Sequence, residues 1–316
     1  MRSYNLLIVT ENKPNTSDGI HCSNQMIGWG LWEAFRDYPH VQLEYRNANN
    51  LTDIPETDFT LVHSYTPGEV FHRLSDLRVK TRQQMMWISE MFCSSFDYCF
   101  TFLPQPGCEQ VPLPAPKDLL DASMVGVTKL KGSVLLDHHW SWTDGYTING
   151  PNPNLWCARL YEWLESIKDW TVIGQMESPN HERISGVPIP SWVKRIPNSF
   201  YHEYLKATAP YENFIMTHPG SYEHSIVDMA ARGIQVLVPT PTVTHKHRDG
   251  WEVVPGGTPF APQDTIDRLK LPTFSTREQL LSLLDRSHDG DWRAYACTDM
   301  PEIARQIDAH CKRVLA

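Results

Sequence analysis

The sequence predicts an α/β protein made of two Rossmann-like, doubly wound domains that face a cleft. Short apolar runs alternate with segments of helical spacing, the alternation stops in a proline-rich stretch, and a second series then begins. Such alternation favours parallel strands connected by helices. A chain of 316 residues is long enough to give each of two domains its own core.

In the first half, the run from Tyr4 to Thr10 is short, apolar and partly β-branched, and a polar loop follows it. We therefore expect it to be a buried strand. Apolar residues then recur at helical spacing over 26–35, which predicts an amphipathic helix. Further strands are expected at 41–45, 59–63, 84–88 and 100–103.

Prolines gather between 104 and 131, where they stiffen the chain and suit a crossing between domains. In the second half the same pattern predicts strands at 133–136, 170–173, 214–217 and 235–238, and helices at 155–167 and 301–315. The expected organisation is an N-terminal domain over 1–125, a C-terminal domain over 126–300 and a closing helix over 301–316. Ligands of such domains bind at the carboxyl ends of the strands.

Composition narrows the possible partners. The net charge of −9, from 28 basic and 37 acidic residues, disfavours polyanions unless basic residues gather locally. Seven cysteines without a C-x-x-C pair argue against a disulfide framework and a thiolate zinc site, so we expect a reducing, cytoplasmic location. No run of about 18 apolar residues occurs, so no membrane span is expected.

Several motifs of other functional classes are absent or incomplete in the sequence, which argues against those functions. The chain has no P-loop, and Gly28-Trp29-Gly30 lacks the third glycine and the strand-turn context of a dinucleotide fingerprint. His138-His139 and His245-x-His247 have no third partner at a recognisable zinc spacing. We therefore predict no metal site.

The segment 214–239 is the most informative about function. It predicts a strand, a glycine-containing loop, a short helix, Gly233 and another strand, in that order. Gly220 and Ser221 precede the helix, whose unpaired N–H groups and positive dipole end form a site for a phosphate or diphosphate. Asp228 inside the helix can accept hydrogen bonds from a ribose diol. Alternatively, Ser225 and Asp228 form a capping box, and a lone histidine such as His218 more often has a structural role than a functional one.

Two patterns in this segment resemble the donor-binding segment of GT-B glycosyltransferases. The stretch 228–236 is similar to Glu-Ala-x-Ala-x-Gly-x-Pro-Val, with Asp228 for the usual Glu and Gln235 for the usual Pro. His218-x-Gly220 with Ser225-x-x-Asp228 is similar to the His-x-Gly…Ser-x-x-Glu signature of UDP-sugar enzymes, with two extra residues between its halves.

The resemblance implies a role for each residue of the donor loop. His218, Gly220 and Ser221 would face the diphosphate, Asp228 the ribose and Glu223 the sugar hydroxyls, and Tyr222 belongs to the same donor-binding set. It also implies a strand and a helix over 271–281, and a last helix that folds back over the N-terminal domain.

Inverting transfer needs a base to take the acceptor proton. Glu90, at the end of a first-half strand, is the preferred candidate, and Asp18 and His21 in the first loop are its competitors. Each has a plainer alternative, since Glu90 can pair with Arg82 and Asp18 can cap the first helix.

The leaving diphosphate needs cationic or N–H donors in a metal-free site. Candidates follow strands or lie in loops of the second half: His138, Lys194, Arg195 and the basic cluster 245–248. The plainer interpretation of that cluster is a solvated loop.

The expected function is metal-independent transfer of a sugar from a nucleotide diphosphate donor, a UDP-sugar, to an acceptor hydroxyl, with no further cofactor. The stretches 58–64 and 84–92 resemble the acceptor domain of phage DNA glucosyltransferases, which implies a hydroxylated DNA base as acceptor; the acidic charge favours a small molecule. The alternatives are a sugar-nucleotide epimerase or hydrolase, and a non-catalytic module that binds carbohydrate or nucleic acid.

Overall fold

The computed structural model contains two compact units, and each is described by itself. Unit 1 comprises residues 1–117, 200–202 and 298–316, and unit 2 comprises 118–199 and 203–297. The structure describes residues 3–10, 20, 23–52, 54, 56–63, 84–89, 93–102, 105–112, 116–137, 146–148, 155–177, 188–197, 199–217, 224–240, 243–245, 261, 263–285 and 300–316. The domain limits expected from the sequence, at 125/126 and 300/301, stay a prediction.

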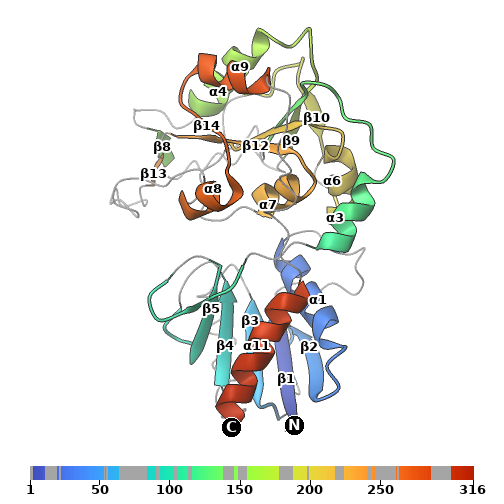
Figure 1. Cartoon of the computed structure of the whole chain (residues 1–316), viewed down its shortest axis with the longest axis vertical. Coiled ribbons are helices and arrows are strands. Elements are labelled where there is room, and N and C mark those ends of the chain that lie inside the picture. The colour runs from blue at the N-terminus through green and yellow to red at the C-terminus, as the bar shows by residue number, and fades with distance from the viewer. Residues whose placement is uncertain are drawn as a thin grey trace. The chain divides into compact units, whose positions relative to one another are not determined.

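Unit 1 is a six-stranded, fully parallel sheet in the order β2-β1-β3-β4-β5-β6. Its elements are β1 (Tyr4–Thr10), α1 (Ser23–Phe35), β2 (Val41–Asn47), β3 (Phe59–His63), β4 (Gln84–Ser89), β5 (Tyr98–Thr101), β6 (Glu109–Gln110) and the last helix α11 (Met300–Leu315). Helices α1 and α11 pack against each other and lie over the same part of the sheet (Figure 1).

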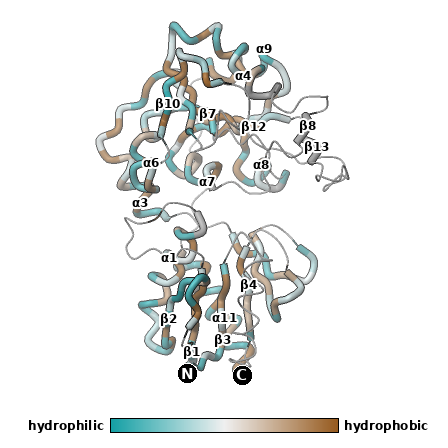
Figure 2. The backbone as a smooth tube through the Cα atoms, turned by 180° about the vertical axis from the view of Figure 1, so that it is seen from behind, coloured by the Kyte–Doolittle hydropathy of each residue, from teal (hydrophilic) through white to brown (hydrophobic). Residues whose placement is uncertain are grey.

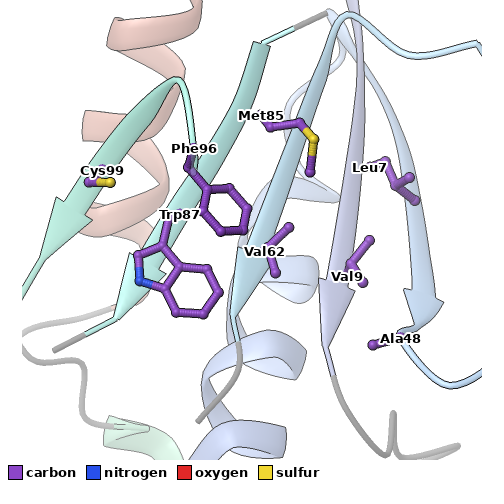
Figure 3. Close-up of a cluster of buried hydrophobic side chains, with 8 residues drawn as sticks. All are labelled: Leu7, Val9, Ala48, Val62, Met85, Trp87, Phe96 and Cys99. Atoms are coloured by element: carbon purple, nitrogen blue, oxygen red, sulfur yellow. The ribbon is translucent and has the colours of Figure 1, made fainter. Parts of the chain in front are cut away.

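One face of this sheet carries a hydrophobic cluster. Because side chains alternate along a strand, every second residue of β1, β3 and β4 points to the same face. The cluster consists of Leu7, Val9, Ala48, Val62, Met85, Trp87, Phe96 and Cys99 (Figure 3). The rings of Trp87 and Phe96 are in contact, with centroids 4.8 Å apart. Strands β1 and β3 of this sheet stand out as apolar segments in Figure 2.

Two glycines of α1 let the helix approach its neighbours closely. A Cβ on Gly28 would overlap Cγ2 of Thr10, and one on Gly30 would lie 2.8 Å from the Met300 side chain of α11. Helix packing therefore explains the Gly28-Trp29-Gly30 motif, in agreement with its rejection as a nucleotide fingerprint.

A buried polar network connects α11 to the amino end of β1. Asp308 accepts hydrogen bonds from the Tyr4 hydroxyl at 2.8 Å, from Nε2 of His40 at 2.7 Å and from Nζ of Lys312 at 2.5 Å. Burial raises the pKa of Asp308, but the bonds from Lys312, His40 and Tyr4 outweigh burial and hold it below its usual value. The carboxylate is therefore stabilised in its charged form at the junction of helix and sheet.

Unit 2 is also a six-stranded parallel sheet, in the order β10-β9-β7-β11-β12-β14. Its strands are β7 (Val134–Leu136), β9 (Ile173–Met176), β10 (Lys194–Ile196), β11 (Asn213–Ile215), β12 (Gln235–Pro239) and β14 (Thr273–Phe274). Its helices are α3 (Lys117–Met124), α4 (Leu155–Glu165), α6 (Tyr201–Thr208), α7 (His224–Ala231), α8 (Gln263–Leu269) and α9 (Arg277–Leu284). Strands β8 (Tyr146–Ile148) and β13 (Val243–His245) form a separate antiparallel pair.

The predicted α/β class and doubly wound sheets are confirmed, but two strand assignments shift. The strand expected at 170–173 is wrong, because β9 covers Ile173–Met176 and Trp170 is 86% exposed in a turn. Gly174 lies within this strand. It must lack a side chain because Tyr211 crosses over it so closely that a Cβ there would overlap the Tyr211 hydroxyl. The strand expected at 100–103 lies at Tyr98–Thr101, where Tyr98 aligns with Met86 of β4.

The proline-rich stretch contains more structure than the sequence indicated. It contributes β6 to the edge of the sheet of unit 1, and α3 begins at Lys117. The strand and helix implied over 271–281 are present as β14 and α9, whose N-cap Thr276 accepts a hydrogen bond from the backbone N–H of Gln279.

Candidate functional site

The two sheets reverse their strand order at different places. Numbered within its unit, the sheet of unit 2 runs 3-2-1-4-5-6, and the order reverses between β7 and β11. The sheet of unit 1 runs 2-1-3-4-5-6 and reverses between β1 and β3. Ligands of doubly wound sheets bind at the carboxyl ends of the strands at such a reversal. The residues at the carboxyl ends of these four strands are therefore the first candidates for ligand contact.

In unit 2, Asp137 follows β7 and is fully buried. Its N–H donates to the carbonyl of Ile215 at 3.1 Å, and its own carbonyl accepts a hydrogen bond from Nε2 of Gln175. The Tyr161 hydroxyl holds Gln175 in turn, donating to its Oε1 over 3.2 Å. These bonds fix the backbone at the carboxyl end of β7, where a carboxylate and the following residue begin the loop.

Helix α7 brings Asp228 to the same unit, after the loop that follows β11. Asp228 is 1% exposed. The helix ends in a Schellman motif, with N–H groups of Gly233 and Ile234 donating to carbonyls of Ala230 and Met229 at 2.9 Å each. Gly233 has φ 69°, which confirms it as the left-handed stop predicted from the sequence.

The capping alternative for Ser225 and Asp228 fits the structure poorly. A capping box requires the serine immediately before the helix, whereas α7 already begins at His224. The hydroxyl oxygen of Ser225 is buried and has no hydrogen-bond partner among the described residues. Ser225 therefore does not cap α7, and the position of Asp228 needs another explanation.

A buried arginine anchors the end of α7 that lies near Asp228. Arg232 is 1% exposed, and its guanidinium donates to the carbonyl of Leu205 at 2.8 Å and to Oγ1 of Thr208 at 2.9 Å. Its Nε donates to the backbone carbonyl of Asp228 at 3.1 Å. The Arg232 guanidinium thus lies at the carboxyl end of α6, where the helix dipole favours a positive charge. Its hydrogen bonds connect this end of α6 to α7.

Lys194 and Arg195 lie elsewhere in unit 2. Both are exposed on β10, the edge strand, and Arg195 forms a 3.1 Å ion pair with Glu177. Strand β10 is two strands from β7, a separation of about 10 Å at the usual spacing of roughly 4.8 Å. The structure does not bring these cations to the reversal, and their contact with phosphate stays a prediction.

The other predicted site residues lie outside the described residues. They are Asp18, His21, Glu90, His138, His218, Gly220, Ser221, Tyr222 and Glu223. Of the basic cluster 245–248, the structure describes only His245, at the end of β13. Their roles stay predictions.

In unit 1, polar side chains end four neighbouring strands. Thr10, His63, Ser89 and Thr101 terminate β1, β3, β4 and β5, and each is at most 5% exposed. The Thr10 hydroxyl lies 2.9 Å from the Tyr45 hydroxyl. The sequence pointed to Glu90, which directly follows Ser89, and did not single out this row.

His63 is the titratable member of the row. Its Nδ1 lies 2.6 Å from the carbonyl oxygen of Ile88, so Nδ1 must carry the proton and donate. The ring also meets Phe102 edge-on, with centroids 6.3 Å apart. A backbone carbonyl thus holds the proton on Nδ1 and orients the ring, which leaves Nε2 as the nitrogen that could exchange a proton.

The sequence did not single out His63, and it pointed to Asp137 only within the stretch 137–140, one of the sets expected to contact phosphate. Both are polar residues at the end of an apolar strand: Phe59-Thr-Leu-Val precedes His63, and Val134-Leu-Leu precedes Asp137. Within the described part of the chain, no group of three or more His, Cys, Asp or Glu residues could hold a metal ion, and no helix is long and apolar enough to cross a membrane.

Comparison with known proteins identifies the fold. No family model and no curated protein sequence matches the chain. Among solved structures, AviGT4, a glycosyltransferase involved in avilamycin A biosynthesis, has a TM-score of 0.57 at 13% identity, covering 99% of this chain and 98% of that one.

Two further similar structures are UDP-N-acetylglucosamine 2-epimerases. The enzyme from Rickettsia bellii has a TM-score of 0.54 at 11% identity, with 99% and 96% of the two chains covered. The enzyme from Neisseria meningitidis, solved with UDP-GlcNAc bound, has a TM-score of 0.54 at 8% identity, with 98% and 100% covered. Since such similarity spans both units, the chain has the GT-B fold, with two Rossmann-like domains.

Proposed function

We propose that this protein is an enzyme that binds a nucleoside diphosphate sugar in unit 2 and transfers the sugar to an acceptor hydroxyl. The observation that carries the proposal is the buried Asp228 on α7, the helix that follows the strand at the order reversal in a GT-B fold. A carboxylate there can accept hydrogen bonds from both ribose hydroxyls.

The rest of the donor would bind around α7. The first N–H groups of this helix have no partners within it, and its dipole favours an anion, so its amino end suits a diphosphate. His218, Gly220 and Ser221 immediately precede the helix in the chain and would complete this site with Tyr222 and Glu223. Stabilising the leaving diphosphate by N–H donors and local cations requires no metal ion, and we propose a metal-independent reaction.

Unit 1 would supply the base. His63 ends β3 at the carboxyl edge of that sheet, and Glu90 directly follows β4 in the sequence. Asp18 and His21 follow β1 and remain competitors for the role. General-base catalysis contributes about 10²–10⁴-fold, so conversion of the true base to an amide should lower kcat by about that factor while the donor still binds.

A thermal-shift screen of nucleoside diphosphate sugars tests the proposal, because a ligand that binds the native state raises the melting temperature. UDP-glucose and UDP-GlcNAc should raise it, and UDP alone should raise it less. If no nucleoside diphosphate or its sugar changes the melting temperature at millimolar concentration, the proposal is contradicted.

Epimerisation is the second candidate function, favoured by the fold similarity to the UDP-GlcNAc 2-epimerases. Incubation with UDP-GlcNAc alone separates the two. An epimerase converts the donor to its 2-epimer without any acceptor, whereas a transferase leaves the sugar configuration unchanged and releases UDP only when an acceptor hydroxyl is present.

For the acceptor we propose a hydroxylated compound, either a hydroxylated DNA base or a small molecule. The net charge of −9 disfavours DNA unless local cations offset it. Affinity for DNA through phosphate contacts falls steeply with salt. Binding of hydroxymethylated duplex DNA that weakens with salt supports DNA, and no binding at low salt supports the small molecule.

A further inference from the structure

Two cysteines face each other across the outer strands of the sheet in unit 1. Strands β5 and β6 pair in parallel, with Phe100 opposite Glu109 and Thr101 opposite Gln110. Extending this register by one residue places Cys99 opposite Cys108. Residues opposite each other on neighbouring parallel strands are roughly 4.8 Å apart and share a face. This separation lies within the Cα–Cα range of disulfides, about 4.4–6.8 Å.

The contacts of the thiols agree with this register. The Cys99 thiol donates to the carbonyl of Cys93 at 3.4 Å. Burial raises the pKa of Cys99; the hydrogen bond to Cys93 lowers it, and the nearby Cys108 thiol raises it further by its charge and by a side-chain hydrogen bond. Cys99 belongs to the hydrophobic cluster (Figure 3), and Cys93 and Cys108 pack against that cluster.

The cysteines differ in exposure. Cys99 is buried, whereas Cys93 and Cys108 are partly exposed, and all three are free thiols. A reagent from solution therefore reaches Cys108 or Cys93 before Cys99. Cys311, also a free thiol, is fully buried in α11 and serves as an unreactive reference within the same unit.

We propose that Cys99 and Cys108 form a redox modification site, in which a low-molecular-weight disulfide converts the two thiols into a reversible cross-strand disulfide. The Cys108 thiolate attacks glutathione disulfide, forming a mixed disulfide and releasing one glutathione thiolate. Cys99 then loses its proton, attacks the Cys108 sulfur and releases the second glutathione. The protein loses two electrons and two protons, which reduce one glutathione disulfide to two glutathione molecules.

The disulfide would connect β5 to the start of β6 at the edge of the sheet. It would also remove the Cys99 donor from the Cys93 carbonyl. In the reducing compartment predicted from the sequence, Cys99 and Cys108 remain as two thiols. A shift to oxidising conditions would form the disulfide between them. This inference is independent of the proposed sugar-nucleotide activity.

Peptide mapping after oxidation tests the proposal. The full chain is incubated with glutathione disulfide, free thiols are alkylated, and the protein is digested without reductant by chymotrypsin, which can cleave after Phe96, Phe100 and Phe102 between the three cysteines. Mass spectrometry should find a peptide pair joined through Cys99 and Cys108, lacking two hydrogen atoms, and dithiothreitol should abolish it. Cys311 should be alkylated only after denaturation.

Two matched variants sharpen the test. Cys93→Ser keeps both proposed partners and should still form the Cys99–Cys108 link. Cys108→Ser removes the exposed partner, and its Cys99 should no longer be oxidised under the same conditions. Both substitutions are at partly exposed positions, and circular dichroism checks that the variants fold.

The proposal would be overturned by a wild-type map in which Cys108 carries only a stable glutathione adduct. A link between Cys93 and Cys99 in place of the Cys99–Cys108 link in the wild type would also overturn it. Both results are read in the folded wild-type chain, so they hold even if a variant fails to fold.

Discussion

The two units have the same kind of sheet but different residues where the strand order reverses. In unit 1 the reversal lies between strands that end at Thr10 and His63, and both side chains are engaged by the protein, with Tyr45 and the carbonyl of Ile88. In unit 2 it is followed by Asp137, and buried Asp228 lies on the next helix. A histidine whose Nδ1 proton is held by a backbone carbonyl thus ends a strand at the reversal of unit 1, whereas two buried carboxylates follow the reversal of unit 2.

This difference suggests how two similar sheets can be suited to different chemistry. A carboxylate on the helix after the reversal can accept hydrogen bonds from a ribose, and the amino end of that helix suits a diphosphate. A histidine suits proton transfer. We therefore propose donor binding in unit 2 and acid–base chemistry in unit 1, and variants in each unit test the two proposals.

The largest expected effect concerns stability in unit 1. Trp87 is 1% exposed within the hydrophobic cluster, so Trp87→Ala should lower the free energy of unfolding by about 3–5 kcal/mol. Trp170→Ala in unit 2 is the matched control, because Trp170 is 86% exposed and should change stability by less than about 0.5 kcal/mol. Urea titration followed by circular dichroism measures both, and equal losses would show that the cluster does not stabilise unit 1.

In unit 2, removal of the Arg232 guanidinium should separate α7 from α6. Arg232→Met leaves the carbonyl of Leu205 and the hydroxyl of Thr208 without their buried donor, which should cost about 2–3 kcal/mol. It also frees the end of the helix that carries Asp228, so donor affinity should fall as well. Chemical unfolding and donor titration of the same preparation measure the two effects. Stability lost without any change in affinity would exclude a positioning role.

A smaller effect on stability is expected where Tyr211 packs over Gly174. Gly174→Ala forces a Cβ against the Tyr211 hydroxyl and should cost about 1–3 kcal/mol by overpacking. Tyr211→Phe removes that hydroxyl, which is buried without a hydrogen-bond partner in the described structure, so the double variant should recover part of the loss. Thermal melting of the four proteins forms a double-mutant cycle, and strictly additive effects would disprove the contact.

The smallest effect is a pH dependence in unit 1. Burial lowers the pKa of His310, with Arg313 lowering it further, while Nε2 contacts Oε1 of Gln84 at 2.7 Å. Because the unfolded chain binds the proton more readily, this contribution is present above about pH 6.5 and is lost as pH falls towards the lowered folded pKa. His310→Gln should flatten the fall in unfolding free energy below about pH 6.5. An unchanged slope would assign the effect to other groups.

How far the sequence predicts this molecule depends on the kind of signal. Strands such as 4–10 and 59–63 are apolar runs between polar loops, and both are found with the predicted bounds. Strand β9 was misplaced because Gly174 and Gln175 are not apolar strand formers, and their place in the sheet follows from pairing with β7 and β10, which are distant in the chain.

The candidate site shows the same limit. The αL stop at Gly233 follows from local rules and was predicted. The tautomer of His63 and the support of Gln175 by Tyr161 depend on residues from other elements, so no local pattern contains them. The strand order could not be predicted from the sequence either, because the two reversals depend on pairings between segments that are distant in the chain.

The most direct test of donor binding in unit 2 is the dissociation constant for a UDP-sugar measured by isothermal titration calorimetry. Wild type is compared with Asp228→Asn and with Asp267→Asn, a control at an exposed position of α8 in the same unit. Weakening hydrogen bonds to a buried carboxylate costs about 1.5–3 kcal/mol. We predict at least a tenfold weaker affinity for Asp228→Asn and wild-type affinity for Asp267→Asn. Equal dissociation constants in all three folded proteins would contradict the account.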